Sequence, residues 1–515
     1  MRIPARSVFS IYFALLAIAT FIVFRPQMNL WLGYILLVGI FAWTTLAVSI
    51  GRLTDVQILS LILLTVLLAK LIVVDPVEIG LYGHDPYNNL LLTTELLEHT
   101  PGYSTFEHNY SYPLMYMLTA GLSNFIPLEV AAKYVPLVSL IAPVALFLAL
   151  RDVISSSGAG LGALIFGSTR TLIGFQSKFV PESLGIVFVA LVIMLTVWSR
   201  SKRTDLLGFI FICAVTLTHH LSISMLLISL LCWSLAVSIG AFGLTPDRLK
   251  TIAQPRSSVG PFVIFGILSF TLIFVFLTLD FSEWIIVSVI KSVVTSTGGE
   301  VAGISGSAGG VRETIASMAI VVLGLFASII ACGIVSKRRL PEWVQGLGAA
   351  AGVVAILYAV SLSMGRLTAV DPIRFLSFLL IPLSASAVGI IYTSADRRPM
   401  KTLLISLLAI LFIVTQVASI APWVMYSNPD RTSVTEGHYT RQQWSASEWI
   451  SAYENHAIYV WESGLWKFAT DDIRAISETD TCQGYRVDRE EAPPIAERRN
   501  HKIYSAGAIS LEFCN

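Results

Sequence analysis

The feature that most constrains this chain is a series of long apolar segments separated by loops that carry the charges. Counting runs of about 17 to 22 residues gives roughly thirteen segments that can cross a bilayer as helices. They are centred near residues 16, 40, 65, 138, 167, 190, 213, 231, 269, 325, 353, 384 and 411. Only 13% of the 515 residues are charged, whereas soluble domains carry about 25%. The sequence therefore predicts an all-α polytopic membrane protein.

Basic residues gather in alternate loops: Arg2/Arg6, Arg52, Arg151, Arg200/Lys202/Arg203, Arg248/Lys250/Arg256, Lys337/Arg338/Arg339 and Arg397/Arg398/Lys401. The positive-inside rule assigns all of these loops to the cytoplasm, so we expect a cytoplasmic N-terminus and an extracytoplasmic C-terminus. No small-residue cleavage site separates the first two apolar segments, which indicates an uncleaved anchor. A net charge of +1 indicates no nucleic-acid partner.

This topology places three long segments on the outer face. External loop 1 spans about 75–129, and a Gly/Ser-rich loop over about 280–312 is typical of a flexible segment. Residues 422–515 have ordinary globular composition, and their stretch SASEWISAYENHAIYVWESG predicts a helix followed by a strand. We therefore expect a small mixed α/β domain there, in which Cys482 and Cys514 can pair if the domain is extracytoplasmic.

External loop 1 opens with a polar cluster, GHDPYNNLLLTTE, directly after an apolar segment. Asp85 before Pro86 is typical of a helix start, because the acid caps the helix and proline fits its first turn. That interpretation leaves His84, Asn88 and Asn89 unexplained. A carboxylate at a membrane surface is equally suited to act as a general base or as a ligand of a divalent metal, so both interpretations of Asp85 stay open.

Four further places carry polar residues at the outer boundary of the predicted spans, where ionisable side chains are costly and indicate function. They are Lys178 and Glu182 in GFQSKFVPESLGIVF, His219/His220 in VTLTHHLSISML, Glu300 in the Gly/Ser-rich loop, and Arg366 and Arg374 in SMGRLTAVDPIRFLSFLL. Each also has a structural explanation. Pro-Glu begins helices, paired histidines can be structural, a lone loop acid is solvated, and arginine snorkels to headgroups.

Two of these places favour a particular chemistry. Arginine recognises phosphate through planar, bidentate contacts, so Arg374 is a candidate phosphate-binding residue. Adjacent residues of a helix point to different sides, so His219 and His220 are a poor pair of ligands for one ion. Two interpretations stay open: one is a ligand while the other packs, or both are hydrogen-bonded structural histidines. All candidates lie at the depth of a lipid headgroup on the outer side. The sequence therefore predicts chemistry on a lipid-linked phosphate substrate.

The chain resembles the GT-C superfamily of integral-membrane glycosyltransferases, which includes oligosaccharyltransferase catalytic subunits, protein O-mannosyltransferases and lipid A aminoarabinose transferases. YGHDPYNNLLLTTELLEH followed by YSYPLMYML is similar to the first external loop of oligosaccharyltransferases, where an Asp-Pro-aromatic-x-Asn motif opens a helix. STRTLIGFQSKFVPESLGIVF stands where those enzymes carry a second acidic motif, and DPIRFLSFLLIPL resembles the region whose arginine contacts the lipid pyrophosphate. Two departures are an extra N-terminal hairpin and a tail without the Trp-Trp-Asp motif that binds the acceptor sequon.

The resemblance implies an inverting glycosyltransferase domain over residues 1–421. Its donor would be a polyprenyl- or dolichyl-phosphate-linked sugar, and its acceptor a lipid-linked glycan or a protein. The resemblance implies Asp85 as the catalytic residue. It also assigns the candidates to three groups, one of which includes Asp85 again. These are donor-phosphate binding (Arg374, Lys178 and Arg366), conditional ligands of magnesium or manganese (Asp85, Glu182, His220 and Glu300), and acceptor or sugar binding (His84, Tyr87, Asn88 and His219).

Other classes of membrane protein fit less of the sequence. A flippase or transporter explains the many spans, but transporters tend to show two related halves with broken helices, and no internal symmetry is visible. A lipid-sugar polymerase or O-antigen ligase also works on lipid pyrophosphates, yet usually has one dominant external loop with basic residues. An intramembrane protease fits least, since the sequence has no HExxH motif and no credible paired-Asp arrangement.

Overall fold

The computed structural model describes most of the predicted membrane part and the strands of the tail. The described residues are 4–23, 30–50, 53–74, 81, 85–98, 113–198, 201–241, 259–276, 320, 324–325, 341–363, 372–394, 409–410, 412, 416, 458–460, 473–475, 484–489, 501–506 and 509–514. Some of these positions, among them Asp85, Asn88 and all five strands, are described for the backbone only.

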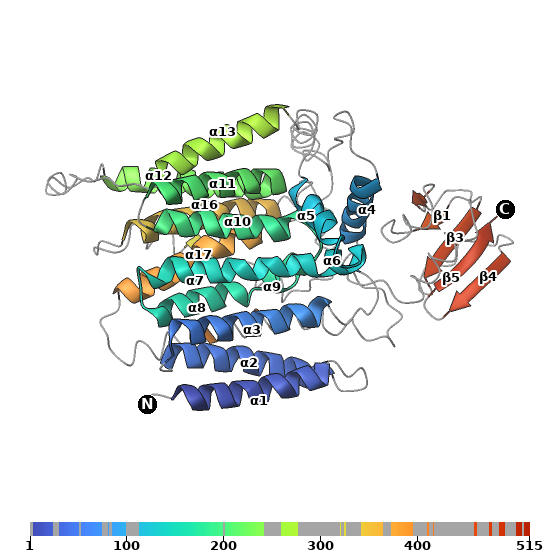
Figure 1. Cartoon of the computed structure of the whole chain (residues 1–515), viewed down its shortest axis with the longest axis horizontal. Helices are drawn as coiled ribbons and strands as arrows, with labels where there is room; N and C mark the ends of the chain where they lie inside the picture. Colours follow the sequence, from blue (N-terminus) through green and yellow to red (C-terminus); the bar gives the residue numbers. More distant parts are fainter. Residues whose placement is uncertain are drawn as a thin grey trace.

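Helices dominate the described part, and the long ones run side by side (Figure 1). They are α1 (Ala5–Val23), α2 (Leu30–Ile50), α3 (Asp55–Val74), α4 (Asp85–Glu98), α5 (Leu114–Leu122), α6 (Leu128–Tyr134), α7 (Ile141–Arg151), α8 (Ser156–Gly167), α9 (Arg170–Ile173), α10 (Pro181–Val197), α11 (Lys202–Thr218), α12 (His220–Ala241), α13 (Gly260–Phe276), α16 (Glu342–Ser363) and α17 (Pro372–Ser394). Two short 3-10 helices are η2 (Val135–Leu140) and η3 (Phe175–Ser177).

Five helical segments of the described residues are long and apolar enough to cross a membrane. They are Asp55–Val74, Leu128–Arg151, His220–Val237, Glu342–Val360 and Arg374–Tyr392. Shorter apolar helices, including α8 and α10, lie among them. The structure thus confirms a largely helical protein with several potential membrane spans, whereas the count of thirteen stays a prediction.

The apolar run centred near residue 167 holds a short helix of 12 residues, α8. Helix α8 ends at Gly167, because Ser168 and Thr169 turn the chain and donate their hydroxyls to the carbonyls of Ile165 and Phe166. The remainder of that apolar run forms a turn and not a second half of the helix.

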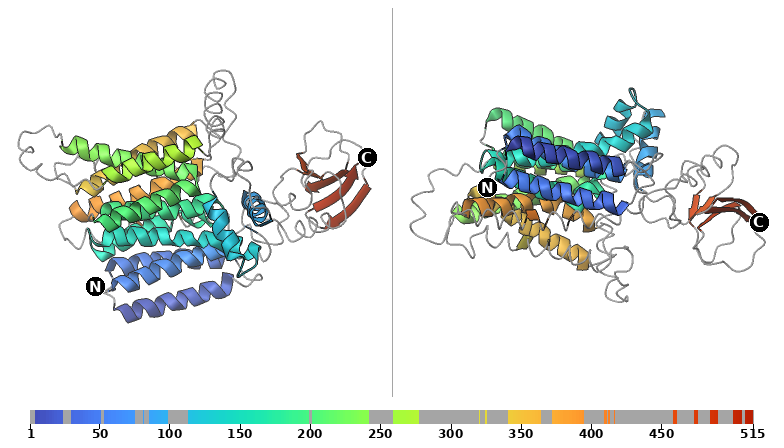
Figure 2. Two further views of the ribbon diagram at one scale, coloured as in Figure 1. Left: turned by 45° about the horizontal axis from the view of Figure 1, so that its top comes forward. Right: turned by 90° about the horizontal axis from the view of Figure 1, so that it is seen from below.

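The long helices run between two ends of the helical body. An ion pair and a capping box lie at one of these ends. Arg151 at the end of α7 places its Nη1 3.4 Å from the carboxylate of Asp55 at the start of α3. Helix α11 starts in a capping box, in which Ser201 and Thr204 bond each other's backbone N–H. We call this the Arg151 end. The short helices α4, α5 and α6 gather at the opposite end, which we call the α4 end (Figure 2).

The predicted N-terminal hairpin packs onto the rest through buried hydroxyls. The hydroxyl of Tyr12 in α1 lies 3.0 Å from the hydroxyl of Thr65 in α3. The hydroxyl of Thr44 in α2 lies 3.1 Å from the same Thr65 hydroxyl. Hydrogen bonds between polar side chains hold helices together in an apolar environment, where the hydrophobic effect supplies little. One buried threonine therefore joins the hairpin to the third helix.

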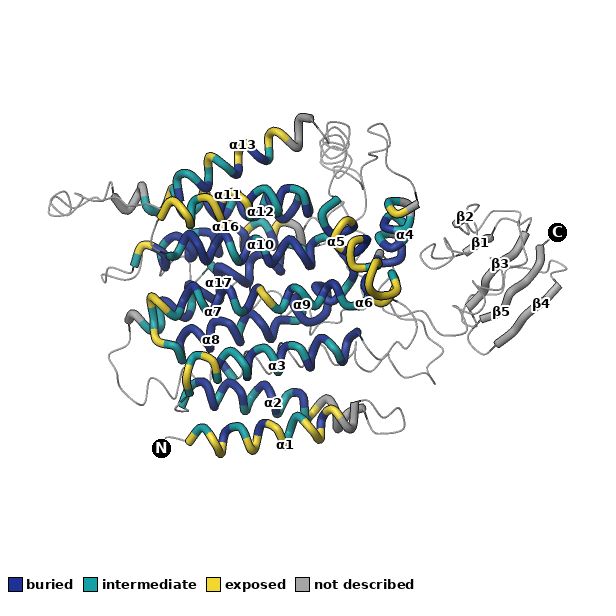
Figure 3. The backbone as a smooth tube through the Cα atoms, viewed as in Figure 1, coloured by how far each residue is buried: buried dark blue, intermediate teal, exposed yellow. Residues whose placement is uncertain are grey.

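Close packing elsewhere depends on glycine. A Cβ at Gly346 of α16 would lie 2.3 Å from the ring of Trp233 of α12, and a Cβ at Gly389 of α17 would lie 2.6 Å from Trp343. Small residues of this kind let membrane helices approach each other closely. Figure 3 shows the result, with buried residues concentrated in the centre of the helical body and exposed ones on α1, α13 and α5.

The C-terminal segment contains a five-stranded sheet of order β2-β1-β3-β5-β4. Its strands are β1 (Ile458–Val460), β2 (Ile473–Ala475), β3 (Gly484–Arg489), β4 (His501–Ala506) and β5 (Ile509–Cys514). Strand β1 pairs in parallel with β2 and β3, while β5 pairs antiparallel with β3 and β4. The predicted strand is therefore present as β1. The predicted helix before it and Cys482 lie outside the described residues.

Candidate functional site

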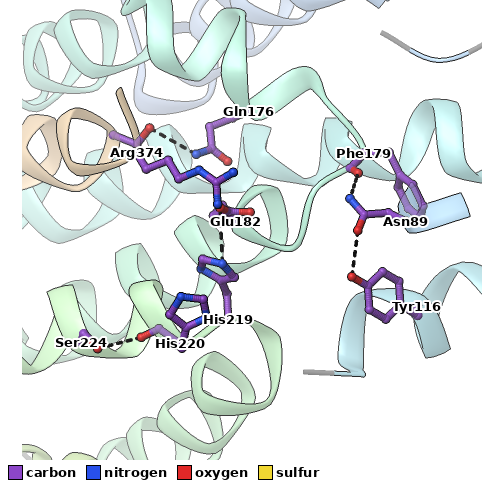
Figure 4. Close-up of polar contacts among 10 residues, drawn as sticks. Asn89, Tyr116, Gln176, Phe179, Glu182, His219, His220, Ser224 and Arg374 are labelled. Atoms are coloured by element: carbon purple, nitrogen blue, oxygen red, sulfur yellow. Dashed lines mark hydrogen bonds and ion pairs between the residues drawn. The ribbon is translucent and has the colours of Figure 1, made fainter. Parts of the chain in front are cut away.

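The candidate site is built around residues 168–180, the turn between α8 and α10, which we call the 168–180 turn. Thr169 caps the short helix α9, and Ser177 donates its hydroxyl to the carbonyl of Ile173 at 2.6 Å. Pro181 then occupies the first position of α10, where its fixed φ and missing N–H suit a helix start. The turn lies at the α4 end of the helical body, near α4 and α5 (Figures 1 and 4).

Three neighbouring elements hold the 168–180 turn through Gln176 and Ser177. The Nζ of Lys70 in α3 donates to the carbonyl of Gln176 at 2.9 Å and to the hydroxyl of Ser177 at 3.1 Å. Ser139 of η2 donates to the same carbonyl at 3.2 Å. The side-chain amide of Gln176 donates to Ser377 of α17 at 3.3 Å. Buried polar groups are costly unless they are hydrogen-bonded, so these contacts fix the turn.

Helix α4 reaches the same turn through Asn89. The side-chain amide of Asn89 donates to the carbonyl of Phe179 at 2.8 Å, and the hydroxyl of Tyr116 donates to its oxygen at 2.9 Å. Asn89 is four residues after Asp85, so the two positions lie on one face of the helix. The contact ties the helix that begins at Asp85 to the turn that precedes Glu182 (Figure 4).

Tyr87, a predicted acceptor-binding residue, is buried in the packing beneath α4. Its hydroxyl accepts the backbone N–H of Leu81 at 2.9 Å, and its ring belongs to a cluster that includes Met115 and Phe179. Burial raises the pKa of Tyr87 to about 12, so the phenol is neutral at physiological pH. With only 1% of its surface exposed, Tyr87 packs beneath the start of α4, and its role in acceptor binding stays a prediction.

Glu182 joins three helix ends in an ionic cluster. Its carboxylate Oε1 lies 2.8 Å from Nη1 of Arg374 at the start of α17, and 3.4 Å from Nε2 of His219 at the end of α11 (Figure 4). Only 2% of the Glu182 side chain is exposed, against 30% of Arg374. An unpaired buried carboxylate is strongly destabilising, so these partners hold the acid in place. Glu182 therefore lies in the first turn of α10 and also forms an ion pair with Arg374. Arg374 has a partner within the protein in addition to any contact with lipid headgroups.

The two histidines differ from the sequence-based expectation. Their rings lie 4.3 Å apart at 41° and do not point to different sides. The reason is that α11 ends before them: His219 is extended, with φ −167° and ψ 133°, and His220 begins α12. Helical side-chain geometry does not apply across this junction. The Nε2 of His219 contacts Glu182, and the tilted ring of His220 lies against the ring of His219 (Figure 4).

Both described candidates for phosphate binding meet at one aromatic ring. The Nζ of Lys178 and the Cζ of Arg374 each lie 5.8 Å from the ring centroid of Phe175. A cation over an aromatic face is held in place without losing its charge. Lys178 comes from the 168–180 turn and Arg374 from α17, so the turn sets the spacing of the two charges.

The remaining predicted site residues are described in part or not at all. Asp85 is the first residue of α4, as a helix start requires, and Asn88 lies in the first turn of the same helix. The side chains of both lie outside the described part of the structure. His84, Glu300 and Arg366 lie outside it altogether.

A divalent metal is not matched by the described side chains. Within the described ranges, no three His, Cys, Asp or Glu side chains converge so that they could hold an ion. Glu182 directs one carboxylate oxygen to Arg374 and His219, and His220 faces the ring of His219. Asp85 and Glu300, the other two predicted ligands, have no described side chains, so the metal site stays a prediction.

Sequence reasoning missed Lys70 and Gln176, which organise the turn. A lysine inside the apolar run LLAKLIVV was a usable signal, because an ionisable residue within a span indicates a buried partner. Gln176 offered no comparable signal, since glutamine in a predicted turn is ordinary. Its partners Lys70 and Ser377 are 106 and 201 residues away in the chain.

Comparisons with known proteins bear on the fold. No family model matches the sequence, and no curated protein matches it. The structure is similar to the crystal structure of the Archaeoglobus fulgidus oligosaccharyltransferase tethered with an acceptor peptide containing the NVT sequon via a disulfide bond. The TM-score is 0.50 at 12% sequence identity, and the match covers 84% of this chain and 69% of that one. At this identity the likeness concerns the fold alone.

Proposed function

We propose that the protein is a glycosyltransferase that takes a sugar from a polyprenyl- or dolichyl-phosphate donor on the extracytoplasmic face. The acceptor would be a lipid-linked glycan or a protein. The observation that carries the proposal is the meeting of Lys178 and Arg374 at Phe175, beside the buried acid Glu182. Two cations fixed at the end of a GT-C-type helical body suit a phosphate that hangs from a lipid.

The reaction would proceed by a single displacement with inversion. The acceptor oxygen forms a bond to the anomeric carbon while the bond from that carbon to the phosphate oxygen breaks. The electron pair leaves with the polyprenyl phosphate, and the acceptor proton passes to the carboxylate of Asp85. Arg374 and Lys178 would stabilise the negative charge that develops on the phosphate, as preorganised cations do in a transition state.

Glu182 and His219 would hold the guanidinium of Arg374 in this position. Glu182 fixes one nitrogen from the buried side, and His219 contacts the same carboxylate oxygen. A guanidinium carries five N–H donors in a rigid fork, so a contact through Nη1 is compatible with a second contact to phosphate. The charge would then be placed before the donor arrives, which lowers the reorganisation needed during reaction.

The test is sugar transfer from a panel of synthetic polyprenyl- and dolichyl-phosphate sugars, with the purified protein against Asp85→Asn. Transfer by the unaltered protein that Asp85→Asn loses, while the variant remains folded and inserted, would support the proposal. Full activity of Asp85→Asn would remove Asp85 from the reaction. EDTA added to the same assay tests the alternative that Asp85 acts by holding a divalent cation.

Absence of transfer from every donor would contradict the proposal. In that case, binding of the donor lipid by the folded protein would favour a flippase, and transfer from a lipid pyrophosphate would favour an O-antigen-type ligase. The ionic cluster at the α4 end is built from α10, α11 and α17. It favours neither a flippase nor a ligase, so the assay distinguishes them.

A further inference from the structure

Lys70 is a fully buried amine inside a potential membrane span. It belongs to α3, the apolar segment Asp55–Val74, and none of its surface is exposed. An ammonium is costly at such a position, because neither lipid nor packed side chains replace its hydration. A group of this kind is retained by its partners, so the partners indicate its role.

Both hydrogen bonds that the Lys70 side chain forms with the described residues lead to the 168–180 turn. Its Nζ donates to the carbonyl of Gln176 and to the hydroxyl of Ser177. Among the described residues it forms no ion pair, so no carboxylate there neutralises it. Gln176 and Ser177 stand between Phe175 and Lys178, the ring and one of the cations of the candidate phosphate site. Lys70 thus holds the segment that spaces the two phosphate-binding charges.

From this geometry we infer that Lys70 is a positioning residue for the lipid-phosphate site. It fixes the backbone of the 168–180 turn from within the membrane, and thereby sets where Phe175 and Lys178 stand relative to Arg374. The inference rests on the proposed function for its kinetic consequence, but the effect on the turn does not depend on catalysis. Lys70 itself touches neither substrate nor the reacting atoms.

Lys70→Met tests the inference, because methionine has a similar length and no donor. Thr65→Val is the matched control: Thr65 is also buried in α3, but its bonds run to Tyr12 and Thr44, away from the turn. We expect Lys70→Met to raise the KM for a polyprenyl-phosphate sugar about tenfold while kcat falls less. Thr65→Val should lower the melting temperature without changing this KM.

Hydrogen exchange of residues 174–180 supplies a readout that is independent of activity. The amides of Ser177 and Lys178 bond the carbonyls of Gly174 and Phe175, so exchange at these amides reports opening of the turn. We expect faster exchange in Lys70→Met and unchanged exchange in Thr65→Val. Equal changes in both variants, or an unchanged KM and exchange in Lys70→Met, would overturn the positioning role.

The two proposals fail in different ways. If the unaltered protein transfers no sugar, the proposed function fails, and binding of synthetic dolichyl phosphate replaces KM as the second readout. Weaker binding by Lys70→Met, together with faster exchange of the turn, would then preserve Lys70 as a positioning residue of a lipid-phosphate site. Unchanged binding would overturn the inference as well.

Discussion

At the scale of single residues, the cluster of Glu182, Arg374 and His219 serves two purposes that an experiment can separate. A carboxylate with 2% of its side chain exposed requires a partner for stability. Arg374 meets that need and also reaches the surface, since 30% of its side chain is exposed. If Arg374 binds the donor phosphate as proposed, its substitution changes both stability and donor binding, and a second variant is needed to separate the two effects.

Arg374→Ala should destabilise the protein and raise the donor concentration needed for half-maximal transfer. Loss of one partner of a buried ion pair costs about 3 to 5 kcal/mol, here less because Arg374 is partly exposed and His219 remains. The double variant Arg374→Ala with Glu182→Gln removes the buried charge, so it should recover stability but not donor affinity. Thermal unfolding and transfer kinetics measure the two effects. If the double variant recovers both, Arg374 has a structural role only.

At the scale of secondary-structure elements, Asn89 provides the hydrogen bond that the described residues show between α4 and the 168–180 turn, beside the hydrophobic cluster that contains Tyr87 and Phe179. Asn89 bonds the 168–180 turn through its amide and α5 through its oxygen. The first residue of α4 is Asp85, the proposed base. Small displacements of a catalytic group have large kinetic effects, so this attachment should matter for the rate more than for stability.

Asn89→Leu should lower kcat by about tenfold or more, because it frees the start of α4 from the turn. Tyr116→Phe removes only one of the two bonds and leaves the contact to Phe179, so its effect should be smaller. Thr93→Val is the control, since Thr93 donates only within α4, to the carbonyl of Asn89. Steady-state kinetics of the three variants at saturating donor test this order. An equal loss in all three would mean that α4 responds to any polar loss.

The elements of the site were more predictable from sequence than their contacts. Pro181 at the start of α10 and the junction at His219 follow from local rules, because proline suits a first helical position and polar residues end an apolar run. The pairing of Glu182 with Arg374 joins positions 192 residues apart, and no local pattern encodes it. The two histidines lie on the same side, contrary to the prediction, because the side-chain geometry of a helix does not hold across the break between α11 and α12.

At the scale of the whole molecule, the structure separates two sets of charges along the helical body. Arg151 and Asp55 pair at one end, while Glu182 and Arg374 pair towards the other. The alternation of basic loops in the sequence predicted this separation, since helices that cross repeatedly must return such loops to one side. Which end of the helical body faces the cytoplasm stays a prediction, and labelling experiments can test it.

Cysteine labelling should resolve the orientation and test whether the site faces the donor. Lys202 is exposed at the Arg151 end, and Asn124 is exposed between α5 and α6 at the α4 end. Each is replaced by cysteine in a separate variant. In a background with the five native cysteines replaced by serine, an impermeant maleimide should label Asn124→Cys on intact cells and Lys202→Cys only after lysis. The positive-inside rule dictates this order, because Lys202 belongs to a basic cluster. Labelling of Lys202→Cys on intact cells would place Arg374 and Glu182 towards the cytoplasm, and an extracytoplasmic lipid-phosphate sugar would then be on the wrong side of the membrane for the reaction proposed.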